Sequence, residues 1–121
     1  MRKVYNILQN EQKTSFHLDE IVALQPANQV LADSEQQSFI YIVEENEQYS
    51  YLAFGQQTWE SLIPYLEENR DPVVQIGELQ LELTAFTEEL HSLLYNIEGN
   101  SNYGDVFVES VENVFSNISQ E

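Results

Sequence analysis

Carboxylates far outnumber other charged side chains in this sequence, so acid–base catalysis is the first chemistry to consider. The chain holds 21 Asp and Glu residues, with adjacent pairs at Glu44-Glu45, Glu67-Glu68 and Glu88-Glu89. A catalytic pair needs two environments that separate the pKa values of its carboxyl groups. Adjacent residues of a helix or strand point in different directions, and nothing in the sequence separates their surroundings. We interpret these pairs as parts of a solvated acidic surface.

Histidine, serine and glycine give little support for nucleophilic catalysis or phosphate binding. His17 and His91 lie far apart in the sequence, and Glu88, three residues before His91, is its helical neighbour. No G-x-S-x-G elbow, P-loop or dinucleotide fingerprint is present. The chain has no cysteine, which excludes a disulfide, a thiolate metal site and a cysteine nucleophile. We interpret both histidines as ordinary surface residues.

A short segment before the last helix gathers oxygen-bearing side chains. With Glu98 at position 1 of an EF-hand loop, Asn100, Asn102 and Glu109 fall on ligand positions. Position 6, which requires glycine, is Tyr103. A tight turn between two helices explains the segment better, so we predict no metal ion and no cofactor. Asn100, Asn102 and Tyr103 stay candidates for contact with a partner.

Two strand-like runs, at residues 38–43 and 48–54, are rich in aromatic residues. Period-2 alternation predicts two faces. One face receives Ile40, Ile42, Leu52 and Phe54, and the other receives Phe39, Tyr41, Val43, Tyr49 and Tyr51. Tyrosine is favoured at interfaces because it joins an apolar ring to a polar tip. Packing of Phe39, Tyr41, Tyr49 and Tyr51 beneath the helices is the favoured interpretation. The alternative is that these four residues form a candidate interaction surface.

Three hairpins are predicted, over residues 2–18, 38–54 and 73–83. The third turns at Gly77-Glu78, a pair that suits a type II′ turn. The apolar residues of the segment 19–34 show neither the helical nor the strand spacing clearly. The strands are expected to form a mainly antiparallel sheet.

Three helices are predicted. The first follows the second hairpin, has Thr58 as its cap, and contains Pro64, which should kink or split it. Thr84 is expected to cap the second helix and Gly99 to end it, while Asn102 caps the third. The apolar stripe of the third helix extends to Ile118. The last two helices should form an αα-hairpin that packs on the sheet.

Length and composition fit one α+β domain over residues 1–121. Hydrophobic residues make up 42% of the chain and aromatic residues 12%, enough for one core. The net charge is −17, from 4 Lys and Arg against 21 Asp and Glu. Direct binding to nucleic acid or to an anionic membrane is therefore disfavoured. No apolar stretch reaches signal-peptide or membrane-span length, so we expect a cytoplasmic protein.

Several runs resemble one known family. They are Leu31-Ala32-Asp33-Ser34, Ser38-Phe39-Ile40-Tyr41, Trp59, Asn96-Ile97-Glu98-Gly99-Asn100-Ser101-Asn102-Tyr103-Gly104, Phe107, Val111-Glu112 and Phe115. With these residues the chain resembles the YjbL-like family, a group of small, acidic, uncharacterised cytoplasmic proteins from low-GC Gram-positive bacteria. The family has no assigned activity, so the resemblance implies a size and a compartment. Pro64 departs from the family pattern.

Three functions stay open. The first is a non-enzymatic, acidic protein-interaction or adaptor module, because the field of such a chain steers it to a protein partner with a basic surface. The second is a nucleic-acid mimic that inhibits a DNA-binding protein. The third is a Glu-dependent enzyme, with or without a divalent metal. An exposed aromatic face would also allow a homodimer, against the repulsion of like charges.

Overall fold

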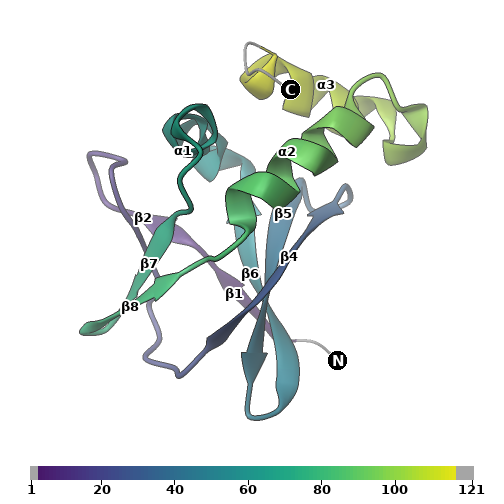
Figure 1. The fold of residues 1–121 in the computed structure, drawn as a ribbon. Helices are drawn as coiled ribbons and strands as arrows, with labels where there is room; N and C mark the ends of the chain where they lie inside the picture. Colours follow the sequence, from purple (N-terminus) through teal and green to yellow (C-terminus); the bar gives the residue numbers. More distant parts are fainter. Residues whose placement is uncertain (1–2, 117–121) are drawn as a thin grey trace.

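Residues 3–116 form two four-stranded sheets, with the α-helices gathered at one end (Figure 1). This computed structural model describes residues 3–116. In the described part, four strand pairs are antiparallel and two are parallel. The α+β class and the mainly antiparallel pairing are confirmed, although the strands divide between two sheets.

The first sheet is built around the predicted central hairpin. Its strands β5 (Ser38–Glu45) and β6 (Gln48–Gly55) turn at Asn46 and Glu47, whose φ angles are 52° and 65°. Positive φ at both positions is the type I′ geometry that fits the twist of a hairpin. The other strands, β1 (Lys3–Asn6) and β4 (Gln25–Asp33), complete the order β1-β6-β5-β4. The segment 19–34 therefore contains a strand that its sequence did not indicate.

The second sheet has the order β2-β3-β7-β8. Its strands are β2 (Leu8–Gln9), β3 (Phe16–His17), β7 (Val73–Ile76) and β8 (Leu79–Glu82). The β7–β8 hairpin is confirmed, with φ +61° at Gly77. The predicted first hairpin is confirmed only at β2 and β3. Strand β1 instead pairs in parallel with β6, because the chain crosses between the two sheets after Asn6.

The α-helices in the described part of the chain lie at one end of the sheets. Pro64 splits the first predicted helix as expected, into a 3-10 helix (Gln56–Leu62) and α1 (Ile63–Glu68). Helix α2 (Phe86–Ile97) packs on β4 and meets α3 (Asp105–Phe115). Gly99 follows α2 with a φ of +66°, which confirms its predicted place. The predicted extension to Ile118 lies outside the described residues.

The predicted cap at Thr84 is wrong. Ala85 holds the cap position of α2, with a φ of 64°, and makes no side-chain cap. The carboxylate of Asp71 accepts hydrogen bonds from the amides of Ala85 and Thr87, at 3.2 and 3.0 Å. A carboxylate from the loop before β7 therefore satisfies the helix amides that a capping side chain would otherwise bind.

The caps predicted at Thr58 and Asn102 are also wrong. Thr58 lies inside the 3-10 helix, and its buried hydroxyl donates to the carbonyl of Gly55. Helix α3 begins after Gly104, and no side chain caps it. The side chain of Asn100 accepts from the amide of Asn102, so it caps the short 3-10 turn between α2 and α3.

The predicted division of the central hairpin into faces is wrong by one residue. Phe39 lies opposite Phe54 and Tyr41 opposite Leu52, so these four side chains share a face. A two-residue turn pairs odd-numbered residues of one strand with even-numbered residues of the next. This core face packs under Trp59, whose ring centroid lies 5.0 Å from that of Phe39 and whose Nε1 donates to the carbonyl of Phe54.

Candidate functional site

The opposite face of the first sheet carries a continuous set of apolar side chains. We call it the open sheet face, defined by Val4, Leu31, Ile40, Ile42, Tyr49, Tyr51 and Ala53. Strand register places Val4 beside Tyr51 and Tyr51 beside Ile42, in one row across three strands. A second row runs from Ala53 through Ile40 to Leu31. Partners in register point to the same side of a sheet, so both rows share one surface.

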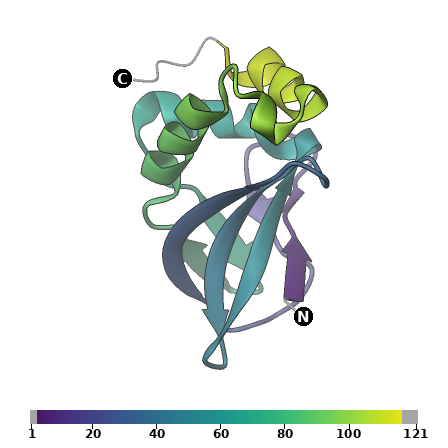
Figure 2. The ribbon, with the colours of Figure 1, turned by 90° about the vertical axis from the view of Figure 1, so that its right-hand side faces the viewer.

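No helix of the described chain crosses the open sheet face. Figure 2 looks onto β4, β5 and β6 from this side, with the second sheet behind them and the helices above. Val4 is 51% exposed and Tyr49 49%, whereas Ile40 is 5% and Ile42 9% exposed. Ile40, Ile42 and Ala53 do not belong to the hydrophobic core cluster. These three residues are therefore nearly buried although they lie outside the core cluster.

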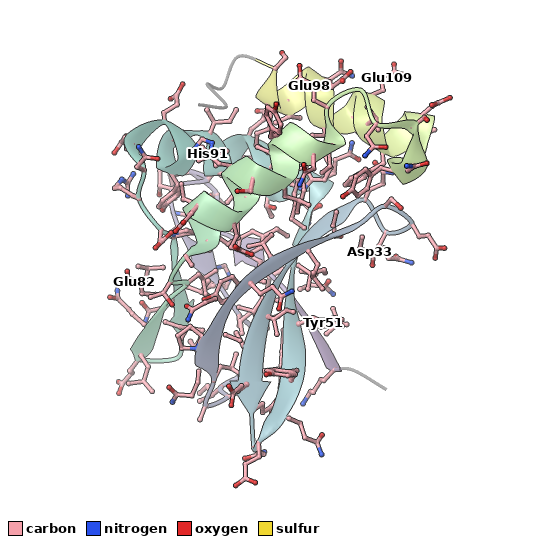
Figure 3. All side chains as sticks on the ribbon, turned by 45° about the vertical axis from the view of Figure 1, so that its right-hand side comes forward. Asp33, Tyr51, Glu82, His91, Glu98 and Glu109 are labelled. Carbon is pink, nitrogen blue, oxygen red and sulfur yellow. The ribbon has the colours of Figure 1, made fainter. Side chains whose placement is uncertain are left out.

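Carboxylates stand at both ends of the open sheet face. Glu44 lies opposite Tyr49 beside the β5–β6 turn, and Glu47 is in that turn. At the other end Asp33, labelled in Figure 3, lies opposite Ser38. The Oδ1 atom of Asp33 accepts from the amide of Gln36 at 3.1 Å, which fixes this carboxylate in the β4–β5 turn. The surface is therefore apolar in its middle and acidic at its ends.

The sequence-based candidates on the two strands separate between the faces. Tyr49 and Tyr51 lie on the open sheet face, as Figure 3 shows for Tyr51. Phe39 and Tyr41 are fully buried in the core, so they cannot contact a partner. The Tyr41 hydroxyl donates to the carbonyl of Thr84 at 2.8 Å, and burial raises the pKa of this hydroxyl. For these two residues the structure shows the favoured interpretation, packing in the core.

The candidates between α2 and α3 have structural contacts. Asn100 donates from its side chain to the carbonyl of Asn96 and accepts from the amide of Asn102. Tyr103 is half-buried, with its ring centroid 6.2 Å from that of Phe107. Asn102 is exposed. The amide of Gly99 donates to Glu112. These bonds hold a helix–helix turn, the structure that the sequence favoured over an EF-hand.

Sequence reasoning missed a cluster around Glu45 on the inner side of the sheet. The Tyr5 hydroxyl lies 2.8 and 2.9 Å from the two carboxylate oxygens of Glu45, and the Ser50 hydroxyl donates to the same carboxylate at 2.9 Å. The hydrogen bond from Tyr5 is the largest cause that lowers the pKa of Glu45. Burial raises the pKa of Tyr5. Glu45 is therefore ionised at neutral pH and serves as a hydrogen-bond acceptor.

A hollow of about 920 Å³ lies beside α2, lined by Asn69, Asp71, Ala85, Thr87, Glu88, His91, Ser92, Tyr95 and Asn96. His91 is half-buried rather than an ordinary surface residue, which corrects the interpretation from sequence. Its Nε2 lies 3.1 Å from the carbonyl oxygen of Leu66 and donates to it, so His91 connects α2 to α1. Its Nδ1 is buried without a hydrogen-bond partner in the described structure. Both carboxylate oxygens of Asp71, which also lines the hollow, accept hydrogen bonds from the amides of Ala85 and Thr87.

Metal-binding clusters and membrane-spanning helices are both absent from residues 3–116. These residues contain no group of three or more His, Cys, Asp or Glu side chains placed to hold a metal ion. None of the helices that they form has the length and apolar character needed to span a membrane.

Comparison with known proteins identifies the family. The family described as "Family of unknown function (UPF0738)" matches residues 2–115. The chain belongs to the UPF0738 family. A UPF0738 protein of Lysinibacillus sphaericus is 41% identical over 127 residues, covering 100% of both chains. One from Staphylococcus saprophyticus is 47% identical over 92 residues, covering 76% of each. No solved structure matches the chain.

The UPF0738 match confirms the broader part of the predicted resemblance. The relatives are uncharacterised proteins of low-GC Gram-positive bacteria, including Bacillus cereus, where the matching protein is 36% identical over 96 residues. The YjbL-like name is not confirmed. The family description contains no activity, so a function has to be argued from the geometry of this chain.

Proposed function

We propose that the chain is a non-enzymatic interaction module of the cytoplasm, which binds a protein partner through the open sheet face. The observation that carries this proposal is the row of Val4, Tyr51 and Ile42 on a sheet surface that no described helix covers. Ile42 is nearly buried in this row, so the accessible part of the face comes from Val4 and Tyr49, which are 51% and 49% exposed, and from the half-buried Tyr51. Exposed apolar side chains that lie together on a folded protein mark an interaction site. Its tyrosines also carry polar hydroxyl groups, which suit a surface that contacts water in the free protein and a partner in the complex.

The charge of the chain supports a basic partner. A net charge of −17 creates a negative potential that attracts cationic proteins over long range. The same potential repels phosphate backbones and anionic lipid surfaces. Partner choice and association rate would therefore come from electrostatics, while the apolar face supplies the contact that holds the complex.

The two alternative functions receive less support. A nucleic-acid mimic needs carboxylates in a band that imitates a phosphate backbone. The labelled residues Asp33, Glu82, Glu98 and Glu109 come instead from four separate places in the fold (Figure 3). A Glu-dependent enzyme that uses general acid catalysis needs a carboxyl group that can hold a proton near neutral pH. The lowered pKa of Glu45 suits the opposite role.

A capture experiment from lysate tests the proposal with matched variants. Tyr51→Ser removes a ring from the open sheet face, and Tyr95→Ser removes an exposed ring from α2, where Tyr95 is 66% exposed. Val4→Ser and Val106→Ser form a second pair, because these valines are 51% and 73% exposed. We expect the wild type and both helix variants to retain the same partner and both sheet variants to lose it. Equal retention by all five proteins would contradict the proposal.

A further inference from the structure

The side chains of β5 on the open sheet face change character along the strand. In order they are Ser38, Ile40, Ile42 and Glu44, and Asp33 lies opposite Ser38. Strands rise about 3.3 Å per residue, so six residues from Ser38 to Glu44 span about 20 Å. Two carboxylates about 20 Å apart therefore bracket an apolar centre.

Both bracketing carboxylates are placed to meet a partner. Glu44 is exposed, and its neighbour across the strand pair is Tyr49. Asp33 is half-buried and is held by the amide of Gln36. The cation of β1, Lys3, lies opposite Ser50 and so on the other face of the sheet, and its Nζ is 3.9 Å from a carboxylate oxygen of Glu20. Two negative groups thus bracket the face along its strands, while the nearby positive group already pairs with a carboxylate.

A second copy of the chain does not complement this surface. A two-fold interface brings the same patch of both subunits together. It would place two sets of Asp33 and Glu44 around one buried apolar area, between two bodies that each carry a net charge of −17. Like charges brought together at an interface oppose association. Charge complementarity therefore favours a different protein, with cations where this chain has carboxylates.

We infer, on the basis of the proposed function, that the open sheet face docks a partner protein presenting an apolar strip with a Lys or Arg side chain at each end. The apolar strip covers Ile42, Tyr51 and Val4. One cation meets Glu44, and the other meets Asp33. The spacing between the two cations aligns the partner's apolar strip along β5. The apolar rows alone would not fix this alignment.

Three synthetic peptides of equal charge serve as probes. The first has a Thr-Val-Thr-Val-Thr centre with two lysines at each end. The second keeps the lysines but has a Ser-Gly-Ser-Gly-Ser centre, and the third keeps the apolar centre with all four lysines at one end. We expect the first to bind the full chain most tightly and to shift the amide resonances of Ile40, Ile42, Tyr51 and Ala53. Equal binding of all three peptides, or shifts spread over the helices, would overturn the inference.

Charge-removing variants test the two ends of the face. Glu44→Gln and Asp33→Asn keep the size of each side chain, and the amide introduced by Asp33→Asn retains an oxygen that can accept from Gln36. Exposed surface ion pairs contribute modestly, so each variant should weaken the first peptide about twofold to fivefold. Glu109→Gln and Glu88→Gln remove the same charge from α3 and α2, and we expect no more than the small loss due to net charge. Equal losses of peptide affinity in all four variants would show that only the net charge of the chain attracts the peptide. That result would refute a site bracketed by Asp33 and Glu44.

Analytical ultracentrifugation tests whether a second copy of the chain, instead of a different protein, covers the open sheet face. We expect a monomer at low and at moderate salt. A dimer that dissociates in the Tyr51→Ser variant would show that a second copy covers the face, and the inference would be wrong. If the chain captures a salt-sensitive partner that Glu44→Gln and Asp33→Asn retain fully, this inference fails while the proposed function stands. If no partner depends on Tyr51 or Val4, the proposed function fails as well.

Discussion

At the scale of single residues, the hydrogen bonds to Glu45 should make folding stability depend on pH. The folded state lowers the pKa of this carboxyl below its ordinary value of 4.5, chiefly through the Tyr5 hydroxyl. A lowered pKa stabilises the fold above the ordinary value, and this contribution is lost as the pH falls through the folded pKa. We expect Glu45→Gln to lower the urea midpoint at pH 7 and the difference from wild type to shrink below about pH 4.5.

The neighbouring residue provides the control for that prediction. Glu44→Gln changes an exposed carboxyl on the opposite face of the same strand, so it should leave the urea midpoint nearly unchanged. Tyr5→Phe removes the donor and should reproduce most of the pH effect of Glu45→Gln. A difference between Glu45→Gln and wild type that stays constant from pH 7 to pH 3 would contradict the assignment.

Tyr41 tests the polar contacts inside the core. Its hydroxyl donates to the carbonyl of Thr84 and lies 3.4 Å from the amide of Asn28, which donates to it. Tyr41→Phe keeps the ring and leaves a part-buried carbonyl unsatisfied, which should cost about 1–2 kcal/mol of unfolding free energy. Tyr95→Phe removes a hydroxyl from an exposed ring and should cost almost nothing. Urea denaturation of both variants measures the contrast, and equal midpoints would contradict this role of Tyr41.

At the scale of elements, Asp71 is predicted to hold the start of α2. Its two carboxylate oxygens accept from the amides of Ala85 and Thr87, and its charge lies near the positive end of the helix. Asp71→Ala should lower stability by about 1–2 kcal/mol, the usual cost of losing a cap. Asp105→Ala changes an acidic residue in the first turn of α3 that makes no capping bond, so its effect should be smaller. Equal losses in the two variants would refute the capping role.

Local patterns were sufficient to predict most of the elements. Pro64 restricts the backbone, whereas Gly77 and Gly99 permit the positive φ angles that their turns need, and all three mark the boundaries expected of them. Thr84 failed as a cap because the competing acceptor, Asp71, is far away in sequence and close only in the fold. The parallel partner of β1 was likewise not predictable, since parallel strands pair across long connections.

The candidate site was only partly predictable because it depends on strand register. Aromatic alternation correctly indicated that Tyr49 and Tyr51 share a face, but an error of one residue grouped them with Tyr41. A one-residue shift moves every side chain to the other side of a sheet. The signal that could have corrected this error was the two-residue turn that begins at Asn46. Such a turn pairs odd-numbered residues of β5 with even-numbered residues of β6, and it places Ile42 beside Tyr51. Whether Tyr49 and Tyr51 bind a partner stays a prediction.

At the scale of the whole molecule, the net charge should give salt opposite effects on stability and on binding. Repulsion among the carboxylates of a chain with charge −17 destabilises the compact state. The screening length shortens from about 8 Å at physiological ionic strength to about 3 Å at 1 M. Added NaCl should therefore raise the urea midpoint, while the same salt weakens the attraction between this chain and a lysine peptide.

A charge-reduced variant identifies the cause of the salt effect. Glu60, Glu88 and Glu109 are exposed on three different helical elements, and their replacement by Gln lowers the negative charge without touching the open sheet face. The triple variant should have a higher urea midpoint at low salt and a weaker response to NaCl than the wild type. If its response equals that of the wild type, salt acts through solvent exclusion or hydrophobic burial instead, and self-repulsion does not limit the stability of this fold.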